Sequence, residues 1–476
     1  MRWLVPLLAG LLTLASCRDR DSPPSSARSQ PIPPSPNPAA PRPPLPRAFP
    51  LPPAFWVWNR HPPLDHEALG ELALHPRVEL YWQIIDLPDE AVIGGTTSTS
   101  SLRLTPERRA IPVIRLKAGA RTLDDPDLRQ RIRHAWAPFS APGPEAWPAL
   151  QLDYDCPASR LGDYAALLES LRGELKLRTL SITALASWIG ARDFDTLAGA
   201  VDEMMPMFYD LAADAPADVV RGTPRPMLDE ETLRWIGKWK ACPVRWRAGL
   251  PNFQRVSLFE PDGTLVGHFQ EAVAERLALH PAVAFVPGSP RATQRFRVLA
   301  DGTLSGIRIR AGQHLVWRMP EEKMLVRAIA AARESGAAGT IWFAHPASAP
   351  RPLHSVGHLA ALQRGETPPT ELRVTVDARG TLELHNAGEA DLWPRPADSP
   401  WKLVLEADAP GRFGMLEPFD FHAVDAPGSS PARPQLARRI VLEFHSLRAR
   451  ESLRTGTRFI RNPEAGPPDW RILPQP

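Results

Sequence analysis

Residues 150–157 read Leu-Gln-Leu-Asp-Tyr-Asp-Cys-Pro, and this stretch says most about the fold and its chemistry. Side chains of a strand alternate between two faces, so Gln151, Asp153 and Asp155 share one face and the apolar residues share the other. Residues on one face lie about 6.6 Å apart along the strand. Two carboxylates in a low-dielectric interior repel each other, so one of them should hold its proton more tightly. The pair suits a general acid with a residue that tunes it; two structural Asp residues bonded to loop amides are the alternative.

Short apolar β-prone runs alternate with helical stretches on both sides of this segment. Repeated βα units indicate a parallel sheet covered by helices, and eight strands match a (β/α)8 TIM barrel over residues 54–346. A doubly wound open sheet is the alternative, although no Gly-x-Gly-x-x-Gly follows the first strand. The eight strand-like runs are Phe55–Trp58, Val78–Ile85, Ile111–Leu116, Leu150–Asp155, Thr179–Thr183, Met204–Tyr209, Val244–Leu250 and Thr340–Phe343.

Two further regions depart from the βα pattern. The seventh and eighth strands are separated by residues 254–338, which is too long for one connection and predicts an inserted subdomain at about 254–320, followed by a helix at Glu321–Ser335. Within the insertion, Asp301-Gly302 predicts the turn of a hairpin between residues 296–299 and 306–310. Residues 347–370 are expected to form a linker with a helix, and residues 371–476 an antiparallel β-sandwich-like module.

The N-terminus carries an apolar run from Trp3 to Ala15 that is too short to span a bilayer permanently. It ends in Leu-Ala-Ser-Cys at residues 14–17 and resembles a bacterial lipoprotein signal, which implies removal of residues 1–16 and lipidation of Cys17. An ordinary cleaved signal peptide is the alternative. Arg18 in place of the retention aspartate of such signals implies the outer membrane, facing the periplasm or the exterior. Residues 18–53 contain 14 prolines and predict an extended linker.

Composition limits the remaining functions. A net charge of +3 over 476 residues, with 56 basic and 53 acidic side chains, gives no sign of a nucleic-acid partner. Cys156 and Cys242 are expected at opposite ends of the barrel, too far apart for a disulfide. The spacing His354-x-x-x-His358 is a weak metal signal by itself, so neither a metal nor a cofactor is expected.

Aromatic residues and a second polar run suggest a carbohydrate partner. Tyr209 shares the inward face of its strand, and Asp210 begins the loop that follows; a core Tyr and a helix-capping Asp are the alternative. Sugar rings pack their C–H faces on indoles. Trp58, Trp188 and Trp342 are therefore the expected substrate-facing aromatics, together with Gln151 as a polar contact, whereas plain core packing is the competing explanation.

These runs resemble chitinase-like glycosidases of glycoside hydrolase family 18. Gln151-x-Asp153-x-Asp155 is similar to the family's Asp-x-Asp-x-Glu, and Met207-x-Tyr209-Asp210 to its Met-x-Tyr-Asp. The run at 248–253 resembles its Gly-Leu-Pro-x-Tyr, and the one at 339–342 its final Gly-x-x-x-Trp, shortened by one residue. The resemblance implies catalysis by an acid at Asp155, steadied by Asp153, with Tyr209 and Asp210 orienting the substrate. Asp155 in place of Glu and Gln151 in place of Asp are departures from the family's pattern.

The runs Phe55-Trp56-Val57-Trp58 and residues 152–157 are closer still to a bacterial group, domain-of-unknown-function family 3142, regarded as glycosidase-like. We therefore expect a lipid-anchored envelope protein that hydrolyses an envelope or exported polysaccharide. The alternatives are a barrel that binds glycans without catalysis, and an envelope scaffold whose C-terminal module makes the contacts.

Overall fold

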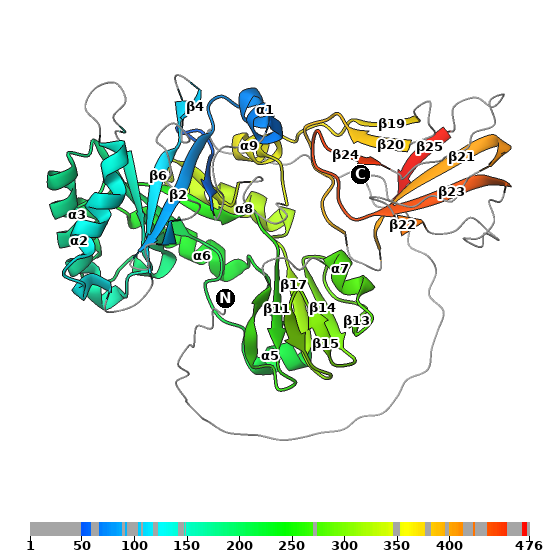
Figure 1. Ribbon diagram of the computed structural model, residues 1–476, viewed down its shortest axis with the longest axis horizontal. Coiled ribbons are helices and arrows are strands. Elements are labelled where there is room, and N and C mark those ends of the chain that lie inside the picture. Colours follow the sequence, from blue (N-terminus) through cyan, green and yellow to red (C-terminus); the bar gives the residue numbers. More distant parts are fainter. Residues whose placement is uncertain are drawn as a thin grey trace. The chain divides into compact units, whose positions relative to one another are not determined.

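Eight parallel strands close into a barrel in the computed structural model (Figure 1). The hydrogen-bonded order is β1-β18-β10-β9-β8-β7-β6-β2, and pairing of β1 with β2 closes the ring. This confirms the predicted TIM barrel and excludes the open sheet. The strands are β1 (Ala54–Val57), β2 (Glu79–Leu87), β6 (Ile111–Leu116), β7 (Ala149–Asp153), β8 (Thr179–Leu185), β9 (Glu203–Met207), β10 (Arg245–Pro251) and β18 (Gly339–Phe343).

The structure describes residues 49–58, 66–87, 91–92, 103–105, 108–117, 122–140, 147, 149–269, 274–345, 353–376, 382–395, 399–412, 422–423, 436–454 and 469–473, which all belong to one unit, residues 46–476. The predicted signal, Cys17 and most of the Pro-rich linker lie outside these residues. Within them, no helix combines the length and the apolar character that crossing a membrane requires.

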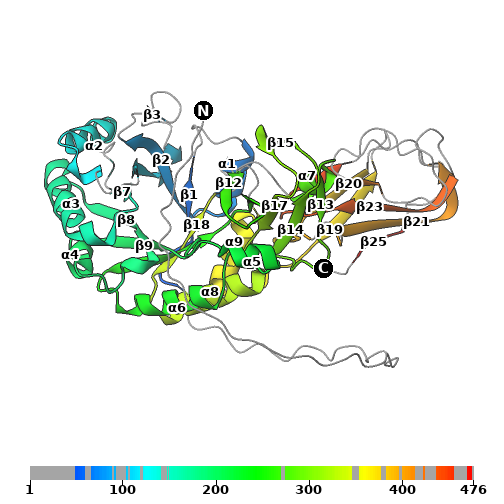
Figure 2. The same ribbon diagram turned by 90° about the horizontal axis from the view of Figure 1, so that it is seen from below.

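Helices surround the barrel, as Figure 2 shows for α2, α3, α4, α6 and α8. The outward faces of the strands pack on them, so that Leu150 and Leu152 of β7 share one core with Leu168 and Leu171 of α3. The predicted division of the β7 residues between a helix-facing and an inward face is thus confirmed. The helices are α1 (His66–Leu74), α2 (Leu128–Trp136), α3 (Leu161–Leu175), α4 (Phe194–Gly199), α5 (Pro216–Arg221), α6 (Glu230–Lys238), α8 (Glu322–Glu334) and α9 (Val356–Arg364).

Local signals set where these helices begin and end. Asp229 precedes α6, and its carboxylate accepts a hydrogen bond from the Thr232 amide at 2.9 Å. In return, the Thr232 hydroxyl oxygen accepts one from the Asp229 amide. This reciprocal cap satisfies two amides that the first helical turn leaves without partners. Ser355 caps α9 in the same position, and Gly365, with φ of 79°, ends it. The left-handed conformation after a helix favours glycine because it has no Cβ.

The barrel interior is filled by polar and aromatic layers. Near the amino ends of the strands, the Arg247 guanidinium contacts Glu203, at 3.1 Å, and Glu79. The next layer contains Trp56, whose indole N–H donates to Gln151 Oε1 at 2.7 Å. Both residues are fully buried. The interior below the carboxyl ends of the strands is therefore solid, which is usual for this fold.

The chain between β10 and β18 folds separately around its own apolar cluster, which includes Val256, Phe296 and Trp317. Its main sheet has the order β12-β11-β17-β14-β13, and β15 pairs with β16. The elements are β11 (Arg255–Phe259), β12 (Leu265–Phe269), α7 (Ala274–Leu279), β13 (Val283–Phe285), β14 (Thr293–Val298), β15 (Gly302–Leu304), β16 (Ile307–Ile309) and β17 (His314–Arg318).

The hairpin predicted around Asp301-Gly302 is wrong. The tight turn falls at Ser305-Gly306, where both residues have positive φ, and it joins β15 to β16. Asp301 instead accepts the Ala311 amide at 3.0 Å. The Asp301 side chain thus holds the loop at Ala311, and Asp301-Gly302 does not form the turn that the sequence predicted.

The C-terminal residues form two antiparallel sheets, with the orders β19-β20-β24 and β22-β23-β21-β25. Leu384 of the first sheet and Leu403 and Leu442 of the second share one buried cluster, which confirms an all-β module. Its strands are β19 (Leu372–Val376), β20 (Leu382–Asn386), β21 (Trp401–Arg412), β22 (His422–Ala423), β23 (Leu436–Phe444), β24 (Ser452–Arg454) and β25 (Asp469–Leu473).

Three short strands lie between β2 and β6 along the chain. They are β3 (Ala91–Val92), β4 (Arg103–Thr105) and β5 (Arg108–Arg109).

The two cysteines among the described residues are free. Cys156 is buried and Cys242 is half-buried, and neither forms a disulfide. The prediction of two unpaired thiols is confirmed.

Candidate active site

Asp153 is the last residue of β7 and lies inside the barrel at its carboxyl end. Its side chain is 12% exposed. One carboxylate oxygen accepts the Thr183 hydroxyl at 2.6 Å, and the other lies 3.5 Å from the Arg115 Nε. Thr183 and Arg115 come from β8 and β6, the two neighbours of β7. Three adjacent strands therefore fix the position of this carboxyl.

Asp153 is the acid whose proton affinity the site changes most clearly. Burial, reinforced by the negative charge of Asp155, raises its pKa from an ordinary 3.8 to about 6, against the opposing effects of Arg115 and Thr183. Asp155 lies beyond the end of the strand, and its side chain is exposed. Partial desolvation by the surrounding protein raises the pKa of Asp155, and the positive charge of Arg115 opposes this rise. The predicted repulsion between the two acids is thus present, but the buried acid is Asp153.

Aromatic side chains lie beside these acids. Tyr209 stacks on Phe343, with ring centroids 5.9 Å apart, and meets the edge of Phe253 at 5.6 Å. Trp58 contacts Phe343 edge-on at 5.8 Å, and the Arg115 guanidinium lies 5.8 Å above the Trp58 ring. Burial, then the charges of nearby Asp153, Asp210 and Asp155, raise the pKa of Tyr209 well above its usual value. The phenol stays protonated near neutral pH and can donate a hydrogen bond.

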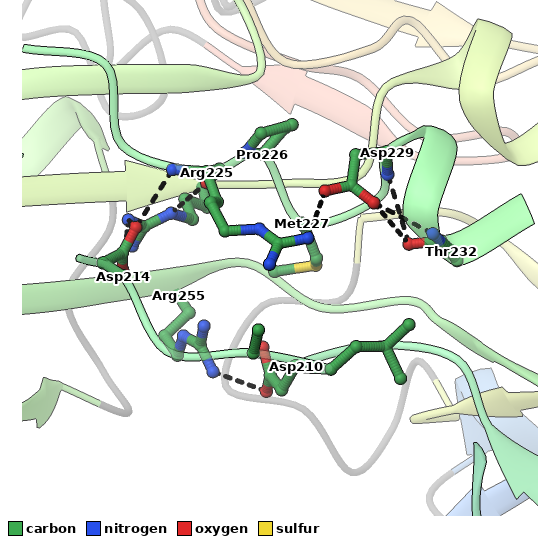
Figure 3. A pocket seen from close by; sticks show the side chains of 11 residues that line it. Asp210, Asp214, Arg225, Pro226, Met227, Asp229, Thr232 and Arg255 are labelled. Carbon is green, nitrogen blue, oxygen red and sulfur yellow. Dashed lines mark hydrogen bonds and ion pairs between the residues drawn. The ribbon is translucent and has the colours of Figure 1, made fainter. Parts of the chain in front are cut away.

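Asp210 follows Tyr209 with φ of 56° and forms an ion pair with Arg255 at 2.5 Å. Both residues line a polar pocket that extends toward the inserted subdomain (Figure 3). There Asp214 holds Arg318 through both oxygens at 2.7 Å, and Arg225 pairs with Asp229 at 2.5 Å. The free volume of about 30 Å³ suits a water molecule rather than a sugar ring. The charges of this pocket pair mainly with one another, which is typical of a structural network.

Three of the predicted substrate contacts are wrong. Gln151, Trp188 and Trp342 are each fully buried. Gln151 lies two residues deeper than Asp153, in the sealed layer with Trp56. Trp188 donates its indole N–H to the Cys156 carbonyl at 3.1 Å within the helix-facing core. Trp342 belongs to the same core, because alternation along β18 turns Phe343 inward in its place.

The other expected residues lie near one another. Asp153, Asp155, Tyr209 and Asp210 interact electrostatically at the carboxyl ends of β7 and β9, and Trp58 lies beside Arg115 and Phe343. Sequence reasoning missed Arg115, Thr183 and Phe343. Arg115 could have been found as a charged residue inside the apolar run at 111–116. Thr183 could have been found as the second polar residue of the alternating run Ser-Ile-Thr at 181–183.

The arrangement combines a carboxyl that keeps its proton up to about pH 6, a second and exposed carboxylate, a phenolic donor and partly exposed aromatic rings. It can donate a proton to a bound oxygen and support a developing positive charge. Within the described ranges, the side chains grouped closely enough to hold a metal are His354, His358 and Asp391, which lie on other elements.

One family model and several solved structures are similar to parts of this chain. Residues 106–258 match the family model described as Domain of unknown function (DUF3142), and the matched segment contains all four acidic and phenolic residues of the site. The resemblance expected from sequence is confirmed over this segment. No curated protein matches the chain at a significant level.

Among solved structures, the spore cortex-lytic enzyme SleL of Bacillus cereus is 15% identical, with a TM-score of 0.44; the match covers 69% of this chain and 76% of that one. A chitinase of Chromobacterium violaceum is 14% identical, with a TM-score of 0.41 and coverage of 62% and 94%. A GH18 chitinase of Cycas revoluta, in complex with (GlcNAc)3, is 13% identical, with a TM-score of 0.41 and coverage of 66% and 98%.

Proposed function

We propose that this chain is a glycoside hydrolase acting on an envelope or exported polysaccharide, with Asp153 as its general acid. The observation that supports this most strongly is the raised pKa of the Asp153 carboxyl at the carboxyl end of a parallel barrel, where enzymes of this fold carry their active sites. The proposal exchanges the roles expected from sequence, in which Asp155 was the acid and Asp153 its partner. Burial favours the exchange, because a general acid needs a pKa raised toward the working pH, and the pKa of Asp153 is raised to about 6.

The reaction proceeds by proton transfer to the glycosidic oxygen. Asp153 donates its proton, the bond between the anomeric carbon and that oxygen breaks, and the leaving sugar departs as an alcohol. Asp155 stabilises the positive charge that develops on the ring, and Tyr209 donates a hydrogen bond to the substrate. A water molecule then adds to the anomeric carbon, and its proton returns to Asp153.

Activity should depend on pH in a defined direction. A general acid works only when protonated, so activity should fall as the pH rises through about 6, the pKa of Asp153. An enzyme that used Asp153 only as an ionised stabiliser would lose activity in the opposite direction.

Release of reducing ends from a panel of bacterial polysaccharides tests the proposal. Wild type should release sugar from at least one of them, and Asp153→Asn should reduce the rate by about 100-fold or more. Asp195→Asn, which changes an exposed Asp on α4, is the matched control and should retain full activity. Equal rates for wild type and Asp153→Asn on a cleaved polysaccharide would exclude Asp153 as the acid.

A barrel that binds glycans without cleaving them is the second candidate. It is supported by the exposure of Asp155 beyond the strand and by the shorter side chain that Asp presents where the family resemblance has Glu. In that case a glycan array would show the same binding for wild type and for Asp153→Asn, and neither protein would release sugar.

The N-terminal sequence supports a lipid anchor at Cys17 in the bacterial envelope, with the Pro-rich segment as spacer. Cys17→Ser should move the protein from the membrane fraction to the soluble fraction. Mass spectrometry of the purified wild-type protein should find acyl chains on residue 17. An unmodified Cys17 would contradict the anchor.

A further inference from the structure

The Thr183 hydroxyl lies between the Asp153 carboxyl and a backbone amide. Its oxygen accepts the Tyr154 amide at 3.3 Å, and it donates its own hydrogen to Asp153 Oδ1 at 2.6 Å. Thr183 is 2% exposed, and Asp153 is the acceptor that its hydroxyl has among the described residues. A hydroxyl has a single hydrogen to donate.

This arrangement indicates which oxygen of Asp153 carries the transferable proton. Two oxygens 2.6 Å apart have one hydrogen between them. If Asp153 supplied that hydrogen, the hydrogen of Thr183 would be left without an acceptor among the described residues, and burying a donor in that state is costly. Oδ1 is therefore the acceptor of the Thr183 hydroxyl, and the proton of the acid belongs on Oδ2.

Arg115 faces that second oxygen. It stands opposite Asp153 in the register of β6 and β7, and its Nε lies 3.5 Å from Oδ2. The guanidinium lies 5.8 Å above the Trp58 ring, and the side chain is 42% exposed at the mouth of the barrel. Asp153 is its ion-pair partner among the described residues, because the nearby Asp86 of β2 accepts the Gln83 amide instead, at 2.8 Å.

The distance between Arg115 Nε and Asp153 Oδ2 suits a contact that strengthens during the reaction. It exceeds the 2.7–3.2 Å of ordinary N–H···O hydrogen bonds, and bonds to an ionised oxygen are shorter still, at about 2.7–2.9 Å. An arginine attracts a protonated carboxyl weakly and an ionised one strongly. Because the half-exposed Arg115 has room to approach, the interaction grows as the proton leaves. An interaction stronger in the transition state than in the ground state accelerates the step.

We propose that Arg115 is the positioning residue of the acid step and pairs with the negative charge that the departing proton leaves on Asp153 Oδ2. This inference rests on the proposed function, in which Asp153 is the general acid. The bond between Oδ2 and its hydrogen breaks, and the proton goes to the glycosidic oxygen. The electron pair of that bond stays on Oδ2, beside the guanidinium.

The other groups around Asp153 do not supply such a cation. Arg115 is, among the described residues, the positive charge that lowers the pKa of Asp153, against burial and the neighbouring acids. Burial keeps the nearby phenols neutral by raising their pKa well above the usual value. The remaining groups that face Asp153 are thus acids and neutral phenols, namely Asp86, Asp155, Tyr164 of α3 and Tyr209.

The link between Arg115 and Asp153 can be measured on the full chain without a substrate. The difference in urea-unfolding free energy between a protein and its Asp153→Asn variant changes with pH up to the native pKa of Asp153. In wild type this change should end at about pH 6. In an Arg115→Met background it should end about one pH unit higher, because an opposite charge has been removed. Arg115→Lys, which keeps the charge, should restore most of the wild-type behaviour.

Release of reducing ends from a polysaccharide that wild type cleaves measures the effect on the reaction. Arg115→Met should move the loss of activity at high pH upward by about one unit, and it should lower the rate at pH 5 by about 10-fold, a part of the 10²–10⁴-fold that a general acid contributes. Arg115→Lys should recover part of this rate. Arg234→Met, which changes an exposed arginine on α6, is the matched control and should alter neither measurement.

The two measurements separate failure of this inference from failure of the proposed function. A stability transition that stays in place or moves to lower pH in Arg115→Met would overturn the inference, whether or not any polysaccharide is cleaved. An unchanged rate at pH 5 on a cleaved polysaccharide would also overturn it. If wild type cleaves nothing, the proposed function fails, and the stability transition still decides whether Arg115 acts on Asp153. Should Arg115→Met not fold, Arg115→Gln removes the same charge and carries the same expectations.

Discussion

Asp153 should destabilise the protein at neutral pH, and Asp153→Asn should reveal it. A carboxyl whose pKa rises from 3.8 to about 6 on folding holds its proton more tightly in the native than in the unfolded state. The contribution of this carboxyl to native stability is therefore greatest below about pH 4, falls between pH 4 and 6, and stays low above pH 6. The rise in pKa corresponds to about 3 kcal/mol of lost stability once Asp153 is ionised. Asn has nearly the same shape and can still accept the Thr183 hydroxyl, but it cannot ionise.

Urea unfolding, followed by tryptophan fluorescence at several pH values from 4 to 8, measures this difference. Asp153→Asn should match wild type at pH 4 and exceed its stability by about 3 kcal/mol at pH 8. Asp195→Asn, which changes a residue on the surface of α4, is the control. Its stability should not exceed that of wild type at pH 8. The reasoning would be refuted if Asp153→Asn were less stable than wild type at pH 8. It would also be refuted if the difference in unfolding free energy between the two proteins did not change with pH.

Three further changes probe the neighbours of Asp153 and the opposite end of the barrel. Asp155→Asn removes a nearby negative charge and should lower the pKa of Asp153, moving the stability transition to lower pH. Thr183→Val removes the 2.6 Å bond to the ionised form and should move the same transition upward; a shift in the same direction for both variants would contradict this electrostatic account. Glu203→Gln leaves the buried Arg247 with less compensation and should cost about 3–5 kcal/mol in urea unfolding, whereas a loss under 1 kcal/mol would contradict a buried ion pair there.

Much of the barrel could be predicted because its signals are local. Each of the eight strands overlaps a predicted apolar run, and α8 (Glu322–Glu334) lies within the helix predicted at Glu321–Ser335. The hairpin of the insertion could not be predicted in the same way. Asp301 is a favourable turn residue, but a bond to the Ala311 amide, ten residues away, determines its conformation.

For the site, the sequence could predict which face of a strand a side chain lies on, because side chains alternate along each strand. Alternation correctly turned Asp153 and Tyr209 inward. It does not give the depth at which a residue sits, so Gln151 was expected at the mouth although it lies in a sealed layer. Arg115 and Thr183 depend on the register between neighbouring strands, which is a property of the closed ring.

The bond between Trp56 and Gln151 has a consequence for proton movement. Together with buried Met205, whose sulfur lies 2.9 Å from the Gln151 amide nitrogen, it forms a closely packed floor under Asp153. Among the described residues, this packing below Asp153 leaves the mouth of the barrel as the route by which protons reach that carboxyl. A bound molecule that covers the opening would also insulate the acid from bulk water, so that the proton it holds on binding is the one available for transfer.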